Sequence, residues 1–388
     1  MKKEEKIYLS LAFVWFTTHF GGGFASGRQV VQYFVSLGKY AIIMPIISQA
    51  ILALVFYAAW SFAFEHKAFN YRVWTDKFYR PVEKVLSPAY EILYNLILVT
   101  ATAVAFATGG ATMTSVLGTP YLVNTAFIAA ALLLLTIFGA RLVRKAATYV
   151  AVAIILGMFV IYVPNIIAGF PQISANMAAF SAQSSTEGPT FWGALWTTFT
   201  YAGFQAVVMG AYIAHSSALK SKSDVTKASI LGFVLNSLML VMTVLGLLIF
   251  LNDGVLADAV PALVVIRNGV GAGWMVPLIS ILIVLGAVST GVNMIYGITQ
   301  RVVTYLSRNE AAEAAQTQER RRSVVVSAIY VLITWSVAQF GLIPLIAKGY
   351  GTLGWISIFV IIIPVVGKFY ILPLFSKKAK TETEPAES

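Results

Sequence analysis

Ten apolar runs of about twenty residues each dominate this chain. That length crosses a hydrocarbon core roughly 30 Å thick, where a helix satisfies its own backbone hydrogen bonds. Of the 388 residues, 59% are hydrophobic and only 11% are charged, far from the average of soluble globular proteins. We therefore predict an all-α polytopic membrane protein with ten transmembrane helices over residues 7–35, 38–64, 88–116, 121–139, 146–169, 190–214, 226–251, 272–304, 323–341 and 352–374.

The basic residues indicate how the chain is oriented. A net charge of +11 would suit a nucleic acid, but Lys and Arg concentrate at both ends and in alternate connections between the runs. The opposite side holds only Lys39, Arg267 and Lys348. We expect no nucleic-acid partner, a bacterial cytoplasmic membrane, and both termini in the cytoplasm, where 375–388 forms a polar tail. The chain has no cysteine, which excludes disulfides and thiolate metal sites.

A glycine-rich stretch interrupts the first run, at "FTTHFGGGFASGRQVVQYF" (16–34). Consecutive glycines are costly in a lipid-facing helix, so they predict a break that lines a protein cavity. A signal peptide is a weaker interpretation, because apolar sequence resumes directly after the glycines. Transporters with inverted repeats break one helix in each half, which predicts a second break about five helices later.

Helix 6 supplies that second break in "WTTFTYAGFQAVVMGAYIAH", where 202–205 resembles 22–25. The two helices run in opposite directions, as a 5+5 inverted repeat requires. We therefore expect one repeat over 1–170 (helices 1–5) and a second over 171–374 (helices 6–10). The alternative is that Gly203 only allows helices to pack closely.

Two motifs carry a family resemblance. Residues 21–24, "GGGF", and 199–205, "FTYAGFQ", resemble the broken helices 1 and 6 of the amino acid, polyamine and organocation (APC) superfamily, which has the LeuT fold. The whole context is most similar to the YkvI-type bacterial membrane proteins. The resemblance implies a transporter with its substrate site between helices 1 and 6.

For the substrate, the half-helix that begins near Ala25 offers free N–H groups and a positive dipole end to a carboxylate. Arg28 would strengthen that preference, or it would instead pair with Asp253 or Asp258 as an outer gate; both interpretations stay open. The aromatic rings near the breaks line the pocket or only pack, and Asn293 binds substrate or joins helices. The candidate substrate-binding residues are Gly22, Gly23, Phe24, Ala25, Arg28, Phe199, Tyr201, Gly203, Phe204, Gln205 and Asn293.

The coupling ion is predicted from helices 6 and 8. The family's helix 6 motif often ends in an acidic residue, but this chain has Gln205 at that position. All Asp and Glu residues lie in loops or near helix ends, with Glu91 the deepest. In helix 8, Gly286, Ser289 and Thr290 resemble the sodium site of LeuT-fold carriers, with carbonyls from Gly21 and Phe24 as further ligands. The alternative is that the two hydroxyls bond within their own helix or to a neighbour.

The sequence therefore favours a secondary transporter that imports an amino acid or similar small carboxylate with sodium, by alternating access. We expect a small-molecule substrate, the lipid bilayer as surroundings, and no cofactor besides the coupling ion. Proton coupling through His19, exchange of organic cations, and a ligand-sensing subunit on a transporter scaffold remain alternatives. His19 either titrates or bonds neighbouring backbone. An enzyme is disfavoured, because three histidines and no cysteine form no nucleophile–base set. The oligomeric state leaves no mark in the sequence.

Overall fold

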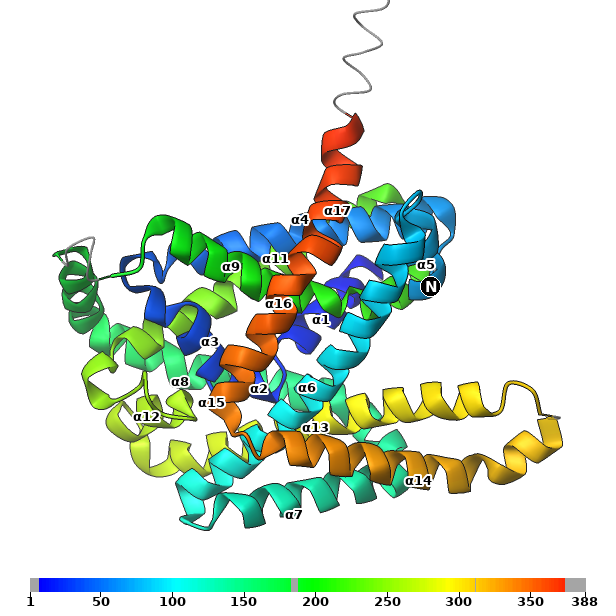
Figure 1. Ribbon diagram of the computed structural model, residues 1–388. Coiled ribbons are helices and arrows are strands. Elements are labelled where there is room, and N and C mark those ends of the chain that lie inside the picture. The colour runs from blue at the N-terminus through cyan, green and yellow to red at the C-terminus, as the bar shows by residue number, and fades with distance from the viewer. Residues whose placement is uncertain (1–6, 183–187, 311, 374–388) are drawn as a thin grey trace, which may run out of the picture.

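The computed structural model describes residues 7–182, 188–310 and 312–373, and within these ranges the chain is helical without a strand. Eight helices of the described chain are long and apolar enough to cross a membrane, which makes this a multi-pass membrane protein. The predicted tail 375–388 lies outside the described residues, as do the basic residues of 1–6. Figure 1 shows the helices as one bundle, with the first segments of the chain at its centre.

Most predicted spans correspond to single helices, and they differ mainly at their ends. The last span is instead segmented by π-helical turns. The helices are α4 (Ile43–His66), α6 (Glu83–Leu117), α7 (Tyr121–Leu134) with a π-helical turn Leu135–Gly139, α8 (Ala140–Ala182), α11 (Lys222–Leu248), α13 (Ala272–Leu306), α14 (Ala312–Ala338), α15 (Leu342–Pro344), α16 (Gly351–Ser357) and α17 (Ile363–Val366). In Figure 1, α13 and α14 form a long antiparallel hairpin with α7 beside α14.

The predicted interruption of the first helix is confirmed. The segment divides into α1 (Ile7–His19), α2 (Gly22–Ala25) and α3 (Arg28–Tyr33). Gly27 has a φ of 81°, a left-handed conformation that side chains with a Cβ rarely adopt, and it separates α2 from α3. The Ser26 hydroxyl donates to the Gly23 carbonyl at 2.8 Å. The turns of the break thus satisfy much of their own backbone.

The second interruption falls later than predicted. Helix 6 divides into α9 (Phe191–Val207) and α10 (Met209–His215), and Val208 separates them. Gly203, where the break was expected, lies inside regular helix α9. A Cβ added there would lie 2.2 Å from the Gly354 carbonyl oxygen of α16. The glycine is therefore needed for close helix packing, the alternative weighed above, and α16 crosses α9 in Figure 1.

Two short helices lie at opposite ends of the bundle (Figure 1). Helix α5 (Tyr71–Phe78) packs against α6 and α10, and α12 (Pro261–Asn268) is at the far end, against α13 and α3. Helix α5 buries Trp74 and Phe78, and the Trp74 indole donates to the Ala59 carbonyl at 3.0 Å. The Ala262 amide of α12 donates to the Ser26 carbonyl at 3.0 Å. The break in the first helix is thus covered on the α12 side.

The contact between α9 and α16 yields a stability prediction. Gly203→Ala should destabilise the protein by about 1–3 kcal/mol, because the new methyl group must push the two helices apart. Gly297→Ala in α13 is the matched control, since nothing lies within 4 Å of a Cβ there, and it should be neutral or slightly stabilising. Thermal unfolding in detergent measures both. Equal melting points for the two variants would contradict the packing role of Gly203.

Candidate functional site

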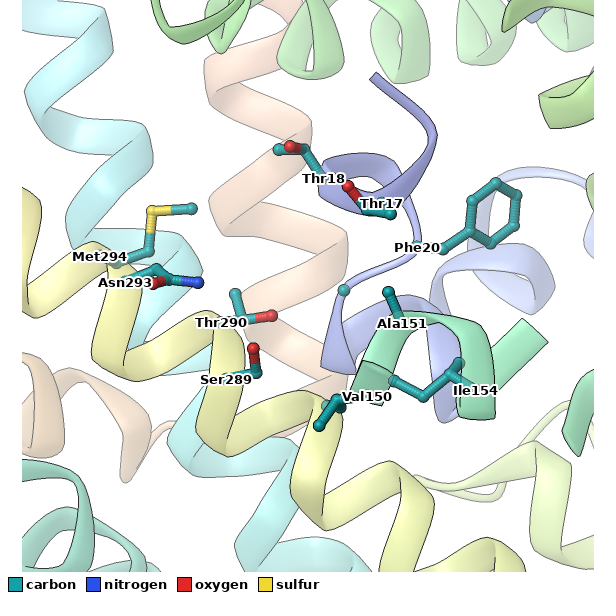
Figure 2. Close-up of a pocket in the computed structure, with 12 residues that line it drawn as sticks. Thr17, Thr18, Phe20, Val150, Ala151, Ile154, Ser289, Thr290, Asn293 and Met294 are labelled. Atoms are coloured by element: carbon teal, nitrogen blue, oxygen red, sulfur yellow. The ribbon is translucent and has the colours of Figure 1, made fainter. Parts of the chain in front are cut away.

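Two adjoining cavities lie beside the break in the first helix. The larger, here called the hydroxyl cavity, has a volume of about 210 Å³ and lies between α1, α8 and α13 (Figure 2). Its lining is rich in hydroxyl groups and holds no charged side chain. The lining residues are Thr17, Thr18, Phe20, Gly21, Val150, Ala151, Ile154, Gly286, Ser289, Thr290, Asn293 and Met294.

The hydroxyls of α13 face the break directly. Figure 2 shows Ser289 and Thr290 directed from α13 toward the start of the break. The approach is close, since a Cβ added to Gly21 would lie 3.0 Å from the Thr290 Oγ1 atom. Oxygen ligands of this kind suit a hard cation. Among the described residues no group of three or more His, Asp and Glu side chains gathers to hold a metal ion.

The structure brings four of the five predicted sodium ligands together. Gly21, Gly286, Ser289 and Thr290 all line the hydroxyl cavity, whereas Phe24 lines its neighbour. The Gly21 carbonyl accepts hydrogen bonds from the amides of Phe24 and Ala25 at 3.0 and 3.1 Å. The Phe24 carbonyl accepts one from the Gly27 amide at 2.8 Å. Both predicted carbonyl ligands thus also close turns of the break. The Phe24 oxygen, with one hydrogen bond, keeps a second lone pair, whereas the Gly21 oxygen already accepts two.

The smaller cavity, here called the glutamine cavity, has a volume of about 60 Å³. It shares four lining residues with the hydroxyl cavity, so the two adjoin at the break. The rings of Phe204 and Tyr350 stack at 4.6 Å on its wall. The lining residues are Thr18, His19, Gly21, Gly23, Phe24, Gln29, Ile97, Ala101, Val104, Ala105, Phe204, Gln205, Val208, Thr290, Met294 and Tyr350.

The predicted substrate-binding residues divide between these cavities and their surroundings. Those that line the glutamine cavity are Gly23, Phe24, Phe204 and Gln205, and Asn293 lines the hydroxyl cavity. Gly22 lies in α2. The residues that line neither cavity are Ala25, Arg28, Phe199, Tyr201 and Gly203.

Gln29 is a cavity residue that the sequence analysis missed. It is the second residue of α3 and is only 5% exposed. Its Oε1 atom is buried and has no hydrogen-bond partner among the described residues. A Cβ added to Gly23 would lie 3.0 Å from the Gln29 Nε2 atom, so the amide lies against the break. The available signal was an amide side chain inside an apolar run.

His19 connects three helices at the edge of the glutamine cavity. Its Nδ1 atom lies 2.8 Å from the Asn236 Oδ1 atom of α11, and its Nε2 atom contacts the Tyr201 hydroxyl of α9. The Asn236 amide group donates to the Gly232 carbonyl at 2.7 Å, which leaves Oδ1 to accept from His19. The expected bond to neighbouring backbone is therefore replaced by bonds to two side chains. These bonds fix the ring between α1, α9 and α11.

Arg28 is directed toward the connection before α12. Its Nη1 atom donates to the carbonyls of Leu256 and Asp258 at 2.7 and 3.1 Å. The Asp258 carboxylate instead accepts from the Val260 amide at 2.7 Å. Of the two interpretations left open above, this geometry agrees with the gate, although backbone carbonyls take the place of a carboxylate.

A tyrosine hydroxyl accounts for the interruption of helix 6. Tyr90, buried on α6, accepts a hydrogen bond from the Gly210 amide at 2.7 Å and donates to the Val207 carbonyl at 2.9 Å. In an unbroken helix these two groups would bond within the helix. The hydroxyl is therefore inserted into the hydrogen-bond ladder, which is one of the known causes of a helix kink.

An ion pair lies close to Tyr90, at the α5 end of the bundle. Arg301 of α13 contacts Glu91 of α6 at 3.2 Å and donates to the Tyr71 hydroxyl of α5. Tyr71 in turn donates to Glu91 at 2.7 Å. Burial, helped by the Glu91 hydrogen bond, raises the pKa of Tyr71 to about 12, so the hydroxyl keeps its proton at neutral pH. This cluster joins α5, α6 and α13.

Comparison with known proteins identifies the fold. No family model matches the chain, and no curated protein matches it. Among solved structures, it is similar to the substrate-bound outward-open state of a Na+-coupled sialic acid symporter, with a TM-score of 0.58, 13% identity, and coverage of 95% of this chain and 98% of that one. It is also similar to a manganese transporter of Eremococcus coleocola, with a TM-score of 0.47, 14% identity, and coverage of 97% and 91%. The likeness to the symporter shows a LeuT-like fold, one that membrane transporters use.

The inserted hydroxyl gives a prediction that is specific to one position. Tyr90→Phe should destabilise the protein by about 1–3 kcal/mol, because a buried amide and a buried carbonyl lose their partner. Hydrogen exchange at the Gly210 amide should accelerate as well. Tyr94→Phe, which removes the hydroxyl of the ring stacked beside Tyr90, is the control. Unchanged exchange at Gly210 in Tyr90→Phe would show that the hydroxyl does not hold the break.

Proposed function

We propose that this protein is a secondary transporter that couples the import of an amino acid or similar small carboxylate to sodium. One observation carries the proposal: the hydroxyls of Ser289 and Thr290 face the interrupted first helix across a cavity without charged side chains. A sodium ion needs several oxygen ligands at close range. The two hydroxyls would supply two of them, and the Phe24 carbonyl at the break, which accepts a single hydrogen bond, keeps a lone pair for another.

The ten-span arrangement is part of this proposal. The eight long helices would be completed by the two interrupted ones, α1 to α3 and α9 with α10. Two inverted repeats, residues 1–170 and 171–374, would then place one interrupted helix in each half. By the distribution of Lys and Arg, both termini would lie in the cytoplasm of a bacterial cell.

The contacts at the two ends of the bundle support alternating access. On the α12 side, Arg28 bonds the connection before α12, and the Ser26 carbonyl bonds α12 itself. On the α5 side, the ion pair of Arg301 and Glu91 joins α5, α6 and α13. Each closure consists of a few polar contacts that rocking of one repeat against the other would break and remake. In this scheme Arg28 acts as an outer gate, and the substrate occupies the glutamine cavity.

The first test is the thermal stability of the purified protein against a panel of amino acids, in sodium or in choline. A ligand that binds only the folded state raises the melting point, with about 2.7 kcal/mol of stabilisation at a hundredfold excess over Kd. We expect an amino acid to stabilise the protein in sodium alone. The double variant Ser289→Ala with Thr290→Ala should remove the dependence on sodium.

Ser280→Ala is the matched control for that variant. Ser280 lies on the same helix and donates to the Val276 carbonyl at 2.6 Å, outside the cavity lining, so its loss should leave the sodium effect unchanged. Stabilisation that is identical in sodium and choline would overturn sodium coupling. Stabilisation that follows acid pH instead would favour a proton-coupled carrier and direct attention to His19.

A further inference from the structure

The glutamine cavity leaves one buried polar group without a partner. The Gln29 side chain is almost fully buried, and its Oε1 atom has no hydrogen-bond partner among the described residues. Most buried polar atoms in proteins are hydrogen-bonded, since an unsatisfied one costs roughly 1–3 kcal/mol. An unsatisfied acceptor on a residue that lines a cavity can accept a hydrogen bond from a donor group of a bound ligand.

The amide is held in place by the break itself. Gln29 follows Gly27, whose left-handed backbone turns the chain into α3. The Nε2 end of the amide lies so near Gly23 that a Cβ on this glycine would lie 3.0 Å from it. That same Cβ would lie 2.8 Å from the Val104 Cγ1 atom. The glycine therefore leaves the space that the amide occupies, between the break and α6.

The cavity offers no formal charge to balance an ionic ligand. Its described lining includes no Asp, Glu, Lys or Arg, because Arg28 is directed to the carbonyls of Leu256 and Asp258 instead. A lone amine would bring an uncompensated positive charge into a buried site, at high cost. A lone carboxylate would leave the Gln29 acceptor without a partner, whereas a zwitterion is net neutral and brings a donor. The amide oxygen of Gln29 can accept from its ammonium group, and a cation in the adjoining hydroxyl cavity would lie on the side of its carboxylate.

The walls limit the size of the ligand. Ala101, Val104 and Ala105 of α6 line the cavity together with the stacked rings of Phe204 and Tyr350. The volume of about 60 Å³ is less than a third of the 210 Å³ of the hydroxyl cavity. A long side chain would have to displace packed aliphatic and aromatic groups, which a short side chain avoids.

We propose that Gln29 selects the substrate: its Oε1 atom accepts a hydrogen bond from the substrate's ammonium group and restricts binding to net-neutral amino acids with small side chains. This inference rests on the transport function proposed above. It names a recognition residue that is distinct from the hydroxyl pair of α13.

The experiment compares ligands that differ only in the ammonium group. L-Alanine and propionate are titrated in sodium against the wild-type protein and against Gln29→Leu, with binding followed by thermal shift and calorimetry. The wild-type protein should bind L-alanine at least tenfold more tightly than propionate. Gln29→Leu should lose about ten- to a hundredfold in L-alanine affinity, the effect of a hydrogen bond to a charged group.

Gln49→Leu is the matched control. Gln49 of α4 is also fully buried with an unpartnered Oε1 atom among the described residues, but it lines neither cavity. Its replacement should leave L-alanine affinity unchanged. Gln29→Glu gives a gain of function that does not depend on lost stability: the new carboxylate should let the site bind n-propylamine, which the wild-type site should reject.

Several results would overturn the proposal. Equal affinity of the wild-type protein for L-alanine and propionate would show that the ammonium group is not recognised. Unchanged L-alanine affinity in Gln29→Leu would remove Gln29 from the site while leaving sodium-coupled transport intact. Binding of larger or charged amino acids, with no binding of glycine, L-alanine or L-serine, would refute the substrate class alone. If no amino acid binds in either salt, the proposed function itself fails.

Discussion

The structure depends on how an interrupted helix satisfies its backbone inside a membrane. Each unpaired amide or carbonyl costs several kcal/mol in hydrocarbon, so a break persists only where the protein supplies partners. The first helix uses its own short turns, the Ser26 hydroxyl, and the Ala262 amide of α12. Helix 6 uses the hydroxyl of Tyr90. The two breaks thus have different chemical solutions.

These solutions connect the breaks to the ends of the bundle. The Ser26 carbonyl bonds α12, and Arg28 bonds the connection that leads into α12. Tyr90 packs against Tyr71, which takes part in the ion-pair cluster with Arg301. A displacement at either end would therefore move the backbone beside the cavities. This arrangement gives a physical route by which a small ligand at the centre could favour one closure over the other.

The sequence predicted the features that follow from local chemistry. Apolar runs identified the long helices, and the glycines at 21–23 identified the first break. The position of the second break was wrong, because it depends on Tyr90, more than a hundred residues earlier in the chain. Gly203 carried the expected glycine signal for another reason, the close approach of Gly354.

The candidate site was predictable to a similar degree. Ser289 and Thr290 were identified by their resemblance to the sodium site of LeuT-fold carriers, and they do face the break. The direction of Arg28 was not fixed by sequence, because it depends on where the connection before α12 folds back. Gln29 was missed for a related reason: an amide in an apolar run becomes notable only when its burial and the missing partner are known.

The most direct test of sodium coupling at the break is uptake into proteoliposomes that contain the purified protein. A radiolabelled amino acid that stabilises the protein is supplied outside, with an inward sodium gradient, and accumulation is followed over time. We expect accumulation above the outside concentration while the gradient lasts, with none when choline replaces sodium or when an ionophore dissipates the gradient. Uptake that only equilibrates the label, at the same rate in sodium and in choline, would contradict a sodium-coupled mechanism.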